Sequence, residues 1–491
     1  MKRSAPRIPA PRAPAPRTAP ARAGNARPGA AADPTAQLRA LMARVTALRE
    51  QGRVAETIPL LVEARALAPA QYDLHVLLAS SYQRTGQLER ALGEFAAIAQ
   101  AHPRRSDAYA NLAAMLCLVG APGDALAIAR QAVALDPRSA AALTNLGETH
   151  KLLGDWPAAR DAYARAVAIA PDDAKARMQL GMTQVTMGEW PAGWAALEWR
   201  DRVAANTMHV EALASPAWDG TAPLDGRTVL MAHEQGLGDA IMCVRFARDL
   251  AARGATVIVR APAALAPLLA SAPGITTASV LGTPLPAHDL HVRAMSLPAL
   301  LALVPAALDG APYLTPAGDC PPAIAAALPR DGVPTVAIAW AGNPQHVNDR
   351  RRSIDGRLLA PLLAMPGVRF AALQKHPALA TVLPPALHDR VIDLAPLCDD
   401  FTASAHALAR ANLVLTVDSA VAHLAGAIGA PTLVAIPTVP DYRWLLERSD
   451  TPWYASMTLV RQSTLEDWTP VLDGWRDRVR ALAAARGGAA A

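Results

Sequence analysis

Hydrophobic and polar positions in the first half of the chain recur with a period of 34 residues. Each unit holds two apolar segments that are separated by a glycine and followed by a proline. The glycines are Gly52, Gly86, Gly120, Gly154 and Gly188, and the prolines are Pro69, Pro103, Pro137 and Pro171. Glycine turns the chain between two helices, and proline ends the second helix. The pattern predicts antiparallel helix pairs in units 38–71, 72–105, 106–139 and 140–173, with a partial unit at 174–200.

Small side chains form two columns in this array. One column reads Thr57, Ala91, Ala125, Ala159 and Gly193, and the other reads Ala64, Ile98, Ala132 and Ala166. Such side chains let paired helices approach closely. The array resembles the tetratricopeptide repeat (TPR) over about residues 38–200, most clearly at Leu146, Gly147, Ala159, Tyr163, Ala166 and Pro171. The resemblance implies an α-helical TPR solenoid.

Solenoids of this kind offer a concave surface to a peptide or a partner domain. One helix column places Asn111, Asn145 and Gln179 in three successive units. This run is similar to the asparagine ladder of protein O-GlcNAc transferases, whose amide groups hold an extended peptide backbone. The similarity implies a peptide-binding groove at these three residues. The alternative is a polar surface, because Ala43 and Leu77 occupy the same column in the first two units.

After Arg200 the pattern changes to short apolar runs that alternate with helical segments. Residues 201–226 are interpreted as a linker. The predicted strands are 228–232, 256–259, 335–340, 368–373, 391–394, 413–417 and 432–436, and the predicted helices are 240–252, 356–365, 401–411 and 419–428. This alternation is typical of parallel sheets covered by helices on both faces. We expect two α/β domains, at 227–330 and 331–480, with a cleft between them.

A glycine-rich loop follows the first predicted strand. Gly236 and Gly238 permit close approach of a ligand to the backbone at a helix N-terminus, and Asp239 comes directly after them. The third glycine of the dinucleotide-binding fingerprint is missing, so this motif alone has low specificity. Asp239 is either a carboxylate that faces the cleft or a helix cap, which stabilises by about 1 kcal/mol. The residues leave both interpretations open.

Asp418, Ser419 and Ala420 lie where a predicted buried strand meets a helix. The carboxyl end of a parallel strand beside a helix N-terminus binds anions in open α/β sheets. The backbone N–H groups of Ser419 and Ala420 and the Ser419 hydroxyl are therefore candidates to hold a diphosphate. Asp418 either caps the helix or binds a sugar hydroxyl. His423, one turn further, is either a ligand contact or a half-buried packing residue.

Three consecutive arginines, Arg350 to Arg352, follow the first strand of the second domain, and Asn343 precedes them in the same loop. Guanidinium groups pair well with phosphate. We therefore expect Asn343, Arg350 and Arg352 to contribute to a nucleotide-sugar site. The alternative is a solvated basic loop.

Composition and charge restrict the class of protein. Hydrophobic residues make up 52% and charged residues 18% of the 491 residues, so most of the chain can form packed cores. The formal net charge of +5 arises in residues 1–33, which hold seven basic residues and one acidic residue. We expect a disordered Pro/Ala/Arg-rich tail at 1–37, a second disordered tail at 481–491, and no nucleic-acid-binding face.

The sequence also bears on the cellular compartment. No apolar run reaches the length of a membrane helix, which is about 18 residues or more, and the basic tail lacks the apolar core of a secretory signal. The four cysteines are scattered without CxxC spacing, which favours a reducing compartment and no metal site. We expect a cytoplasmic protein without an integral membrane segment.

The segment from Arg227 to about Trp475 resembles glycosyltransferase family 9, which includes the ADP-heptose:lipopolysaccharide heptosyltransferases. The matching motifs are Gly236-Leu237-Gly238-Asp239, Asp418-Ser419-Ala420-Val421-Ala422-His423-Leu424-Ala425-Gly426, Pro440-Asp441-Tyr442-Arg443-Trp444 and Trp453-Tyr454. The family implies a GT-B fold, in which two Rossmann-like domains face each other across a cleft. It also implies a metal-independent, inverting transfer with Asp239 as the general base, and phosphate contacts from Ser419 and Ala420. The chain departs from the heptosyltransferases at these two residues, where those enzymes carry Thr and Gly.

Repeats followed by such a domain resemble a bacterial group of repeat-containing glycosyltransferase-like proteins. We therefore expect an enzyme that transfers a sugar from a nucleotide-diphosphate sugar to a hydroxyl acceptor, on a protein or a surface glycan, that the repeats recruit. The nucleotide sugar is the donor substrate, and no further cofactor is expected. The alternative is a non-catalytic TPR scaffold with a degenerate transferase domain.

Overall fold

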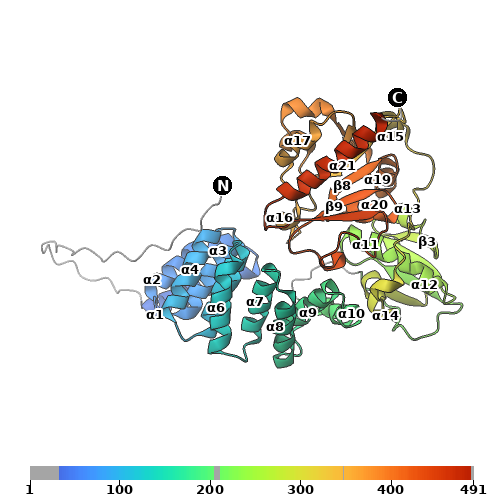
Figure 1. The fold of residues 1–491 in the computed structure, drawn as a ribbon. Helices are drawn as coiled ribbons and strands as arrows, with labels where there is room; N and C mark the ends of the chain where they lie inside the picture. Colours follow the sequence, from blue (N-terminus) through green and yellow to red (C-terminus); the bar gives the residue numbers. More distant parts are fainter. Residues whose placement is uncertain (1–32, 204–210, 347, 488–491) are drawn as a thin grey trace. The chain divides into compact units, whose positions relative to one another are not determined.

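The computed structural model describes residues 33–203, 211–346 and 348–487 (Figure 1). Residues 1–32 of the expected tail therefore lie outside the described residues. The chain divides into two compact units, one up to Ile98 and one from Ala99 onward. The first unit contains the helices α1 (Pro34–Glu50), α2 (Thr57–Leu67), α3 (Tyr72–Arg84) and most of α4 (Leu88–Ala101).

Helix α1 begins three residues earlier than the end of the expected tail. The Asp33 side chain accepts a hydrogen bond from the Thr35 backbone N–H at 3.0 Å, and Pro34 occupies the first helical position. Both features favour a helix start, since aspartate satisfies an unpaired N–H and proline has a helical φ already. Residues 34–37 are thus helical, which corrects the prediction of a disordered segment up to residue 37.

The second unit continues the helical array and confirms the predicted helix pairs. Its helices are α5 (Ser106–Leu118), α6 (Pro122–Leu135), α7 (Ala140–Leu152), α8 (Trp156–Ile169), α9 (Ala174–Thr186) and α10 (Trp190–Leu197), followed by the 3₁₀ turn η2 (Glu198–Arg202). All five periodic glycines have positive φ values, between 73° and 87°. This left-handed conformation is why glycine is needed at each turn. Ala125 and Ala159, from the small-residue column, are fully buried.

Two parallel sheets follow the helical array. The first has the order β3-β2-β1-β4, from β1 (Thr228–Ala232), β2 (Thr256–Ala261), β3 (Ile275–Val280) and β4 (Leu290–Arg293). The second has the order β10-β9-β8-β5-β6-β7, from β5 (Thr335–Ala339), β6 (Arg369–Ala372), β7 (Val391–Asp393), β8 (Leu413–Val417), β9 (Thr432–Ile436) and β10 (Met457–Arg461). Every pairing is parallel, for example Ala337 with Val414.

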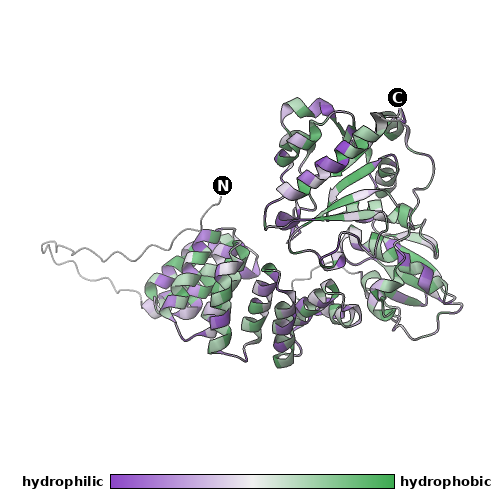
Figure 2. Ribbon diagram, in the orientation of Figure 1, coloured by the Kyte–Doolittle hydropathy of each residue, from purple (hydrophilic) through white to green (hydrophobic). Residues whose placement is uncertain are grey.

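Helices pack beside both sheets. They are α11 (Leu237–Cys243), α12 (Ala247–Ala251), α13 (Ala266–Leu269), α14 (Leu297–Leu300), α15 (Pro322–Ala327), α16 (Asp349–Arg352), α17 (Ala360–Leu363), α18 (Leu379–Val382), α19 (Phe401–Leu408), α20 (Ala420–Ala427) and α21 (Thr469–Gly487). Strands β5, β8 and β9 are buried at every position, and the strands of their sheet are hydrophobic along most of their length (Figure 2). The α/β architecture is therefore the one that the apolar runs predicted.

The second sheet has the strand order of a doubly wound α/β fold. Numbered within the sheet, its strands run 3-2-1-4-5-6 with β5 as the first, and the first sheet repeats the 3-2-1-4 part of that order. In such sheets the connections reverse direction between strands 1 and 4, and ligands bind outside the carboxyl ends at that point. These points lie between β1 and β4 in one sheet and between β5 and β8 in the other.

Several boundaries differ from the predictions. Strands β3, β4 and β10 were not predicted, because their alternating or short apolar runs are weak signals. The segment 240–252, expected as one helix, is divided into α11, a 3₁₀ turn and α12. Helix α21 extends through Gly487, so most of the segment 481–491 that was expected to be a disordered tail is helical; residues 488–491 lie outside the described residues.

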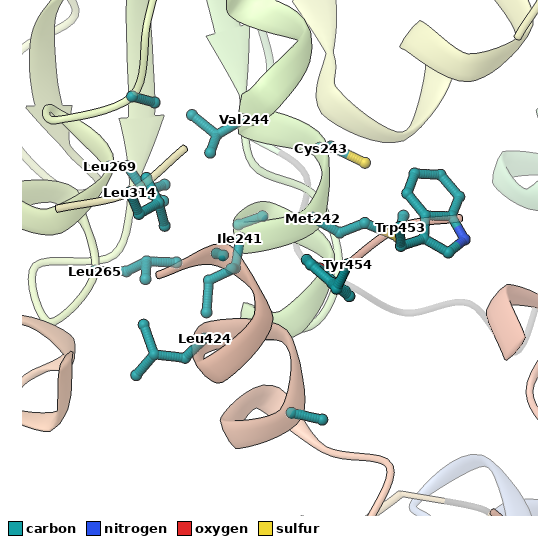
Figure 3. Packing of buried hydrophobic residues seen from close by; sticks show 14 of the residues in the cluster. Ile241, Met242, Cys243, Val244, Leu265, Leu269, Leu314, Leu424, Trp453 and Tyr454 are labelled. Atoms are coloured by element: carbon teal, nitrogen blue, oxygen red, sulfur yellow. The ribbon is translucent and has the colours of Figure 1, made fainter. Parts of the chain in front are cut away.

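The last repeat belongs to the core of the α/β region. Trp190 and Trp194 of α10 are 0% and 1% exposed and lie in the same hydrophobic cluster as Val229 of β1 and Trp453. Trp190 stacks on Trp453 with 5.2 Å between ring centroids. Figure 3 shows further members of this cluster, among them Met242 and Cys243 of α11, Leu424 of α20, and Tyr454. The repeats from Ala99 onward therefore belong to the same compact unit as the two sheets.

Neither a membrane helix nor a metal cluster occurs in the part of the chain that the structure describes. No described helix is both long and apolar enough to cross a bilayer. Within the same residues, no three His, Cys, Asp or Glu side chains gather as metal ligands.

Candidate functional site

The two loops singled out in the sequence meet in the structure. Helix α11, which starts at the glycine-rich loop after β1, packs against α20, which starts after β8. The contact is close at Gly238, where an added Cβ would lie 2.6 Å from Cδ2 of His423. A larger residue would therefore separate the two helices. The segments that follow the carboxyl ends of β1 and β8 are therefore in direct contact.

Asp239 uses both carboxylate oxygens in this arrangement. Oδ2 accepts a hydrogen bond from the Gly236 N–H at 2.8 Å, which caps α11. Oδ1 forms an ion pair with Nη2 of Arg443, which lies in the 3₁₀ turn Tyr442–Trp444 between β9 and β10. Asp239 is thus a cap and also one partner of an ion pair that links the loop after β1 to the turn after β9.

Arg443 is the cation at the centre of this site. It is 8% exposed and pairs with Asp441 as well as Asp239, with 2.6 Å between its Nη1 and Oδ1 of Asp441. Its guanidinium lies 4.2 Å from the ring centroid of Tyr442. The chain is strained just beyond, because Leu445 has a φ of 53°. Non-glycine residues in this region cost about 1–3 kcal/mol and persist where their surroundings hold them, often at functional sites.

Asp418 is buried beside this cation. Burial, and to a smaller extent the nearby Asp441, raise the pKa of its carboxyl to about 6, against the opposing effects of Arg352 and Arg443. Shifted carboxyl pKa values of this kind are common where a protein handles protons or charged ligands. Asp418, Asp441 and Asp239 thus surround Arg443 with three carboxyl groups.

His423 and Ser419 occupy different positions on α20. His423 is 5% exposed, its Nδ1 lies 2.9 Å from the Tyr454 hydroxyl, and its ring stacks on Trp444 at 5.4 Å. Burial holds its pKa well below the usual value, so the imidazole is neutral. Ser419 is the N-cap residue, but its side chain makes no capping hydrogen bond. The contacts of His423 are therefore those of a packing residue. The Ser419 hydroxyl, by contrast, does not cap the helix.

Arg350, Arg351 and Arg352 have different surroundings in the structure. Arg350 is exposed, and Nη2 of Arg351 donates to the Cys117 carbonyl of α5 at 3.3 Å. Arg352 is half-buried, lies 3.4 Å from Asp349 and influences the Asp418 pKa. Asn343 is exposed, and its side-chain oxygen accepts from the Gln345 N–H. Of these expected ligand residues, only Arg352 is placed within electrostatic reach of Asp418.

Two of the three expected groove residues already have partners inside the array. Asn145 donates through Nδ2 to the Ala110 carbonyl at 2.9 Å. The Gln179 side-chain oxygen accepts from Lys151 at 3.3 Å, and Asn111 is half-buried. Asn145 lies in the column that was compared with a peptide-binding ladder. Its side chain joins two neighbouring repeats.

Several residues of this site were not predicted from the sequence. Arg443 and Asp441 were noted only as part of a family motif, and Glu234 and His233 were not considered. An arginine between two aromatic residues, in the loop that follows an apolar strand, was the available signal for Arg443. Burial lowers the pKa of His233, and the nearby Asp239 opposes this shift. Its Nδ1 has no hydrogen-bond partner within the described residues.

We expect the free energy of unfolding to show the raised pKa of Asp418. The native protein retains a proton on Asp418 up to about pH 6, whereas the unfolded chain loses it near pH 3.8. The native state thus binds more protons between these values, so its stability falls as pH rises through this window. Asp418→Asn removes the effect, and the variant should gain on the order of 3 kcal/mol relative to the wild type between pH 4 and pH 7.

Urea unfolding of both proteins, followed by tryptophan fluorescence, measures this difference. A constant difference between wild type and variant across the pH range would show that Asp418 titrates normally. The same comparison with Asp450→Asn, an exposed carboxylate paired with Arg448, serves as the control.

Solved structures that resemble part of this chain include one described as a TPR protein. A thermophilic TPR protein from Thermus thermophilus is 22% identical, with a TM-score of 0.30, over 35% of this chain and 98% of that one. MamA from Desulfovibrio magneticus is 19% identical, with a TM-score of 0.28, over 34% and 94% of the two chains. A comparison with curated proteins finds no match. Residues 48–116 and 119–191 match the family model of the tetratricopeptide repeat, so this part of the chain consists of TPR units.

Proposed function

We propose that this protein is a glycosyltransferase with a GT-B arrangement, which transfers a sugar from a nucleotide-diphosphate sugar to a hydroxyl acceptor. TPR units are suited to protein interaction, and in this proposal they recruit the protein or glycan acceptor. The observation that carries the proposal is the contact of the β1–α11 and β8–α20 loops. Each loop lies at the point in its sheet where α/β proteins bind ligands.

The second sheet is the proposed donor domain. The N-terminus of α20 offers the backbone N–H groups of Ser419 and Ala420, and Arg352 adds a positive charge nearby. A helix N-terminus and a guanidinium are both favourable partners for phosphate. In this proposal they bind the diphosphate of the donor, while the acceptor approaches from the side of Asp239.

The reaction would be a single displacement. The acceptor oxygen forms a bond to the anomeric carbon, the bond from that carbon to the phosphate oxygen breaks, and the nucleoside diphosphate leaves with the electron pair. The acceptor proton passes to Asp239, whose Oδ1 is paired with Arg443 in the absence of donor. Donor phosphate competes for Arg443 in this scheme, which frees that oxygen to accept the proton.

Diphosphate binding tests the proposal directly. Ser419→Asp places a negative charge at the N-terminus of α20, so we expect it to weaken ADP, UDP or GDP binding by about 100-fold or more, as a lost charge-assisted contact would. Ser449→Asp adds the same charge at an exposed position and should leave binding unchanged. Calorimetry gives the affinities. If no nucleoside diphosphate binds the wild type, or if Ser419→Asp binds as tightly as the wild type, the donor site is wrong.

A second candidate function is a TPR scaffold with an inactive transferase domain. The occupied oxygens of Asp239 favour it, because a carboxylate held by a cap and an ion pair is unavailable as a base. Slow hydrolysis of a nucleotide sugar by the wild type, with its loss in Asp239→Asn, would select the enzyme. Diphosphate binding without hydrolysis or transfer would select the scaffold.

A further inference from the structure

The last repeat enters the charged site through Arg200. This residue lies in η2, directly after α10, and its side chain is 4% exposed. Its Nε and Nη2 donate to the two carboxylate oxygens of Glu234 at 3.0 and 2.9 Å. Nη2 also donates to the Ser296 hydroxyl, and Nη1 donates to Glu198 at 2.6 Å. Glu234 is therefore held in one orientation by a two-point contact from the repeat array.

Glu234 begins the loop that carries Asp239. Its Oε1 accepts a third hydrogen bond, from the Met295 N–H at 2.9 Å, so both ends of the carboxylate are fixed. Two residues later, the Gly236 N–H donates to Asp239, whose other oxygen pairs with Arg443. The connection from Arg200 to Arg443 thus runs through one short loop with a fixed contact at each end.

The same repeat also holds the other partner of the ion pair. The Trp194 ring meets the ring of Tyr442 edge-on at 5.7 Å, and Tyr442 lies under the Arg443 guanidinium at 4.2 Å. Helix α10 therefore contacts the Arg443 segment, while η2 contacts the Asp239 loop. Two sides of the site depend on one helical pair that precedes the α/β region in the chain.

We infer that Arg200 is a positioning residue for Asp239, and that the last TPR unit is a structural part of the site. The chemical role of Asp239 rests on the proposed function, but the placement of its loop does not. Arginine can hold a carboxylate at two points, whereas lysine offers a single charge. Arg200→Lys should therefore keep the charge and release the loop.

Hydrogen exchange of the full chain tests this inference without a substrate. In Arg200→Lys we expect the Gly236 and Asp239 amides to exchange about tenfold faster, because local opening of the loop becomes easier. Amides of α20 and the thermal midpoint should remain close to those of the wild type. Arg177→Lys is the control, since Arg177 lies in the same repeat but stacks on Trp199, away from Glu234. If Arg200→Lys fails to fold, Glu234→Gln, which is nearly isosteric, carries the same expectation.

Each outcome decides the inference. Unchanged exchange at Gly236 and Asp239 would overturn it, and so would equally faster exchange in Arg177→Lys, which would indicate general loosening of the repeat. Faster exchange in Arg200→Lys alone supports it, even if the wild type transfers no sugar. If the wild type is active, kcat should also fall in this variant while KM for the donor stays the same.

Discussion

Replacing Arg443 with methionine is expected to lower the free energy of unfolding by about 3–5 kcal/mol at pH 7. Methionine fills a similar volume but leaves Asp239, Asp441 and Asp418 around a buried position without their shared cation. The loss should shrink as the pH falls below about 6, because Asp418 then carries a proton and no negative charge. Urea unfolding at pH 7 and pH 5 measures both effects.

Arg448→Met is the matched control for this prediction. Arg448 lies in the same segment of chain and pairs with Asp450, whose side chain is 69% exposed. Ion pairs of that kind contribute about 0–1 kcal/mol. Equal losses for the two variants would contradict the central role of Arg443.

Trp194→Ala is expected to cost about 3–5 kcal/mol, because it removes a large buried ring and leaves a cavity. The ring is 1% exposed and contacts Trp190, Tyr442 and Trp453. Limited proteolysis should then cut between the repeats and the α/β region of the variant, since α10 loses its contact there. Urea unfolding gives the free energy, and mass spectrometry of the fragments locates the cleavage.

Two controls separate packing from other effects. Trp194→Phe keeps most of the ring and removes an indole N–H that has no hydrogen-bond partner within the described residues, so it should cost less than the alanine variant. Trp199→Ala removes a half-buried ring of the same segment that stacks with Arg177 and Arg202. A small loss in Trp194→Ala, similar to that in Trp199→Ala, would show that α10 is not part of the core.

Regular elements of this fold could be predicted because they leave periodic signals. The 34-residue period requires a glycine with positive φ and a small buried residue at fixed places, and both are found. Strands β1, β8 and β9 were located correctly because they are short apolar runs between turn residues. By contrast, β3 has an exposed middle, so its sequence carries little hydrophobic signal.

Contacts between distant segments could not be predicted in the same way. Asp239 and Arg443 are 204 positions apart, and Arg200 and Glu234 are 34 apart across a linker. Neither pair produces a local pattern, since each forms only when helices and sheets pack. Arg350 to Arg352 show the same limit: the sequence presents one basic cluster, whereas the structure directs Arg351 to a helix end and Arg352 toward a buried carboxyl.

The division of the chain after Ile98 has a consequence for protein engineering. Helices α1 to α3 lie wholly upstream of it, whereas the helices that contact Glu234 and Tyr442 lie far downstream. The hydrogen-bond and ion-pair partners of Asp239 described above, Gly236 and Arg443, both lie in the downstream unit, so we expect that the upstream repeats can be exchanged for those of another TPR protein while these two contacts are kept. Chimaeras joined near residue 98 should retain the stability of the downstream part, while chimaeras joined near residue 200 should lose it. The repeats up to Ile98 are therefore the part of the array that can be exchanged, whereas the repeats from Ala99 onward have to be kept with the sheets.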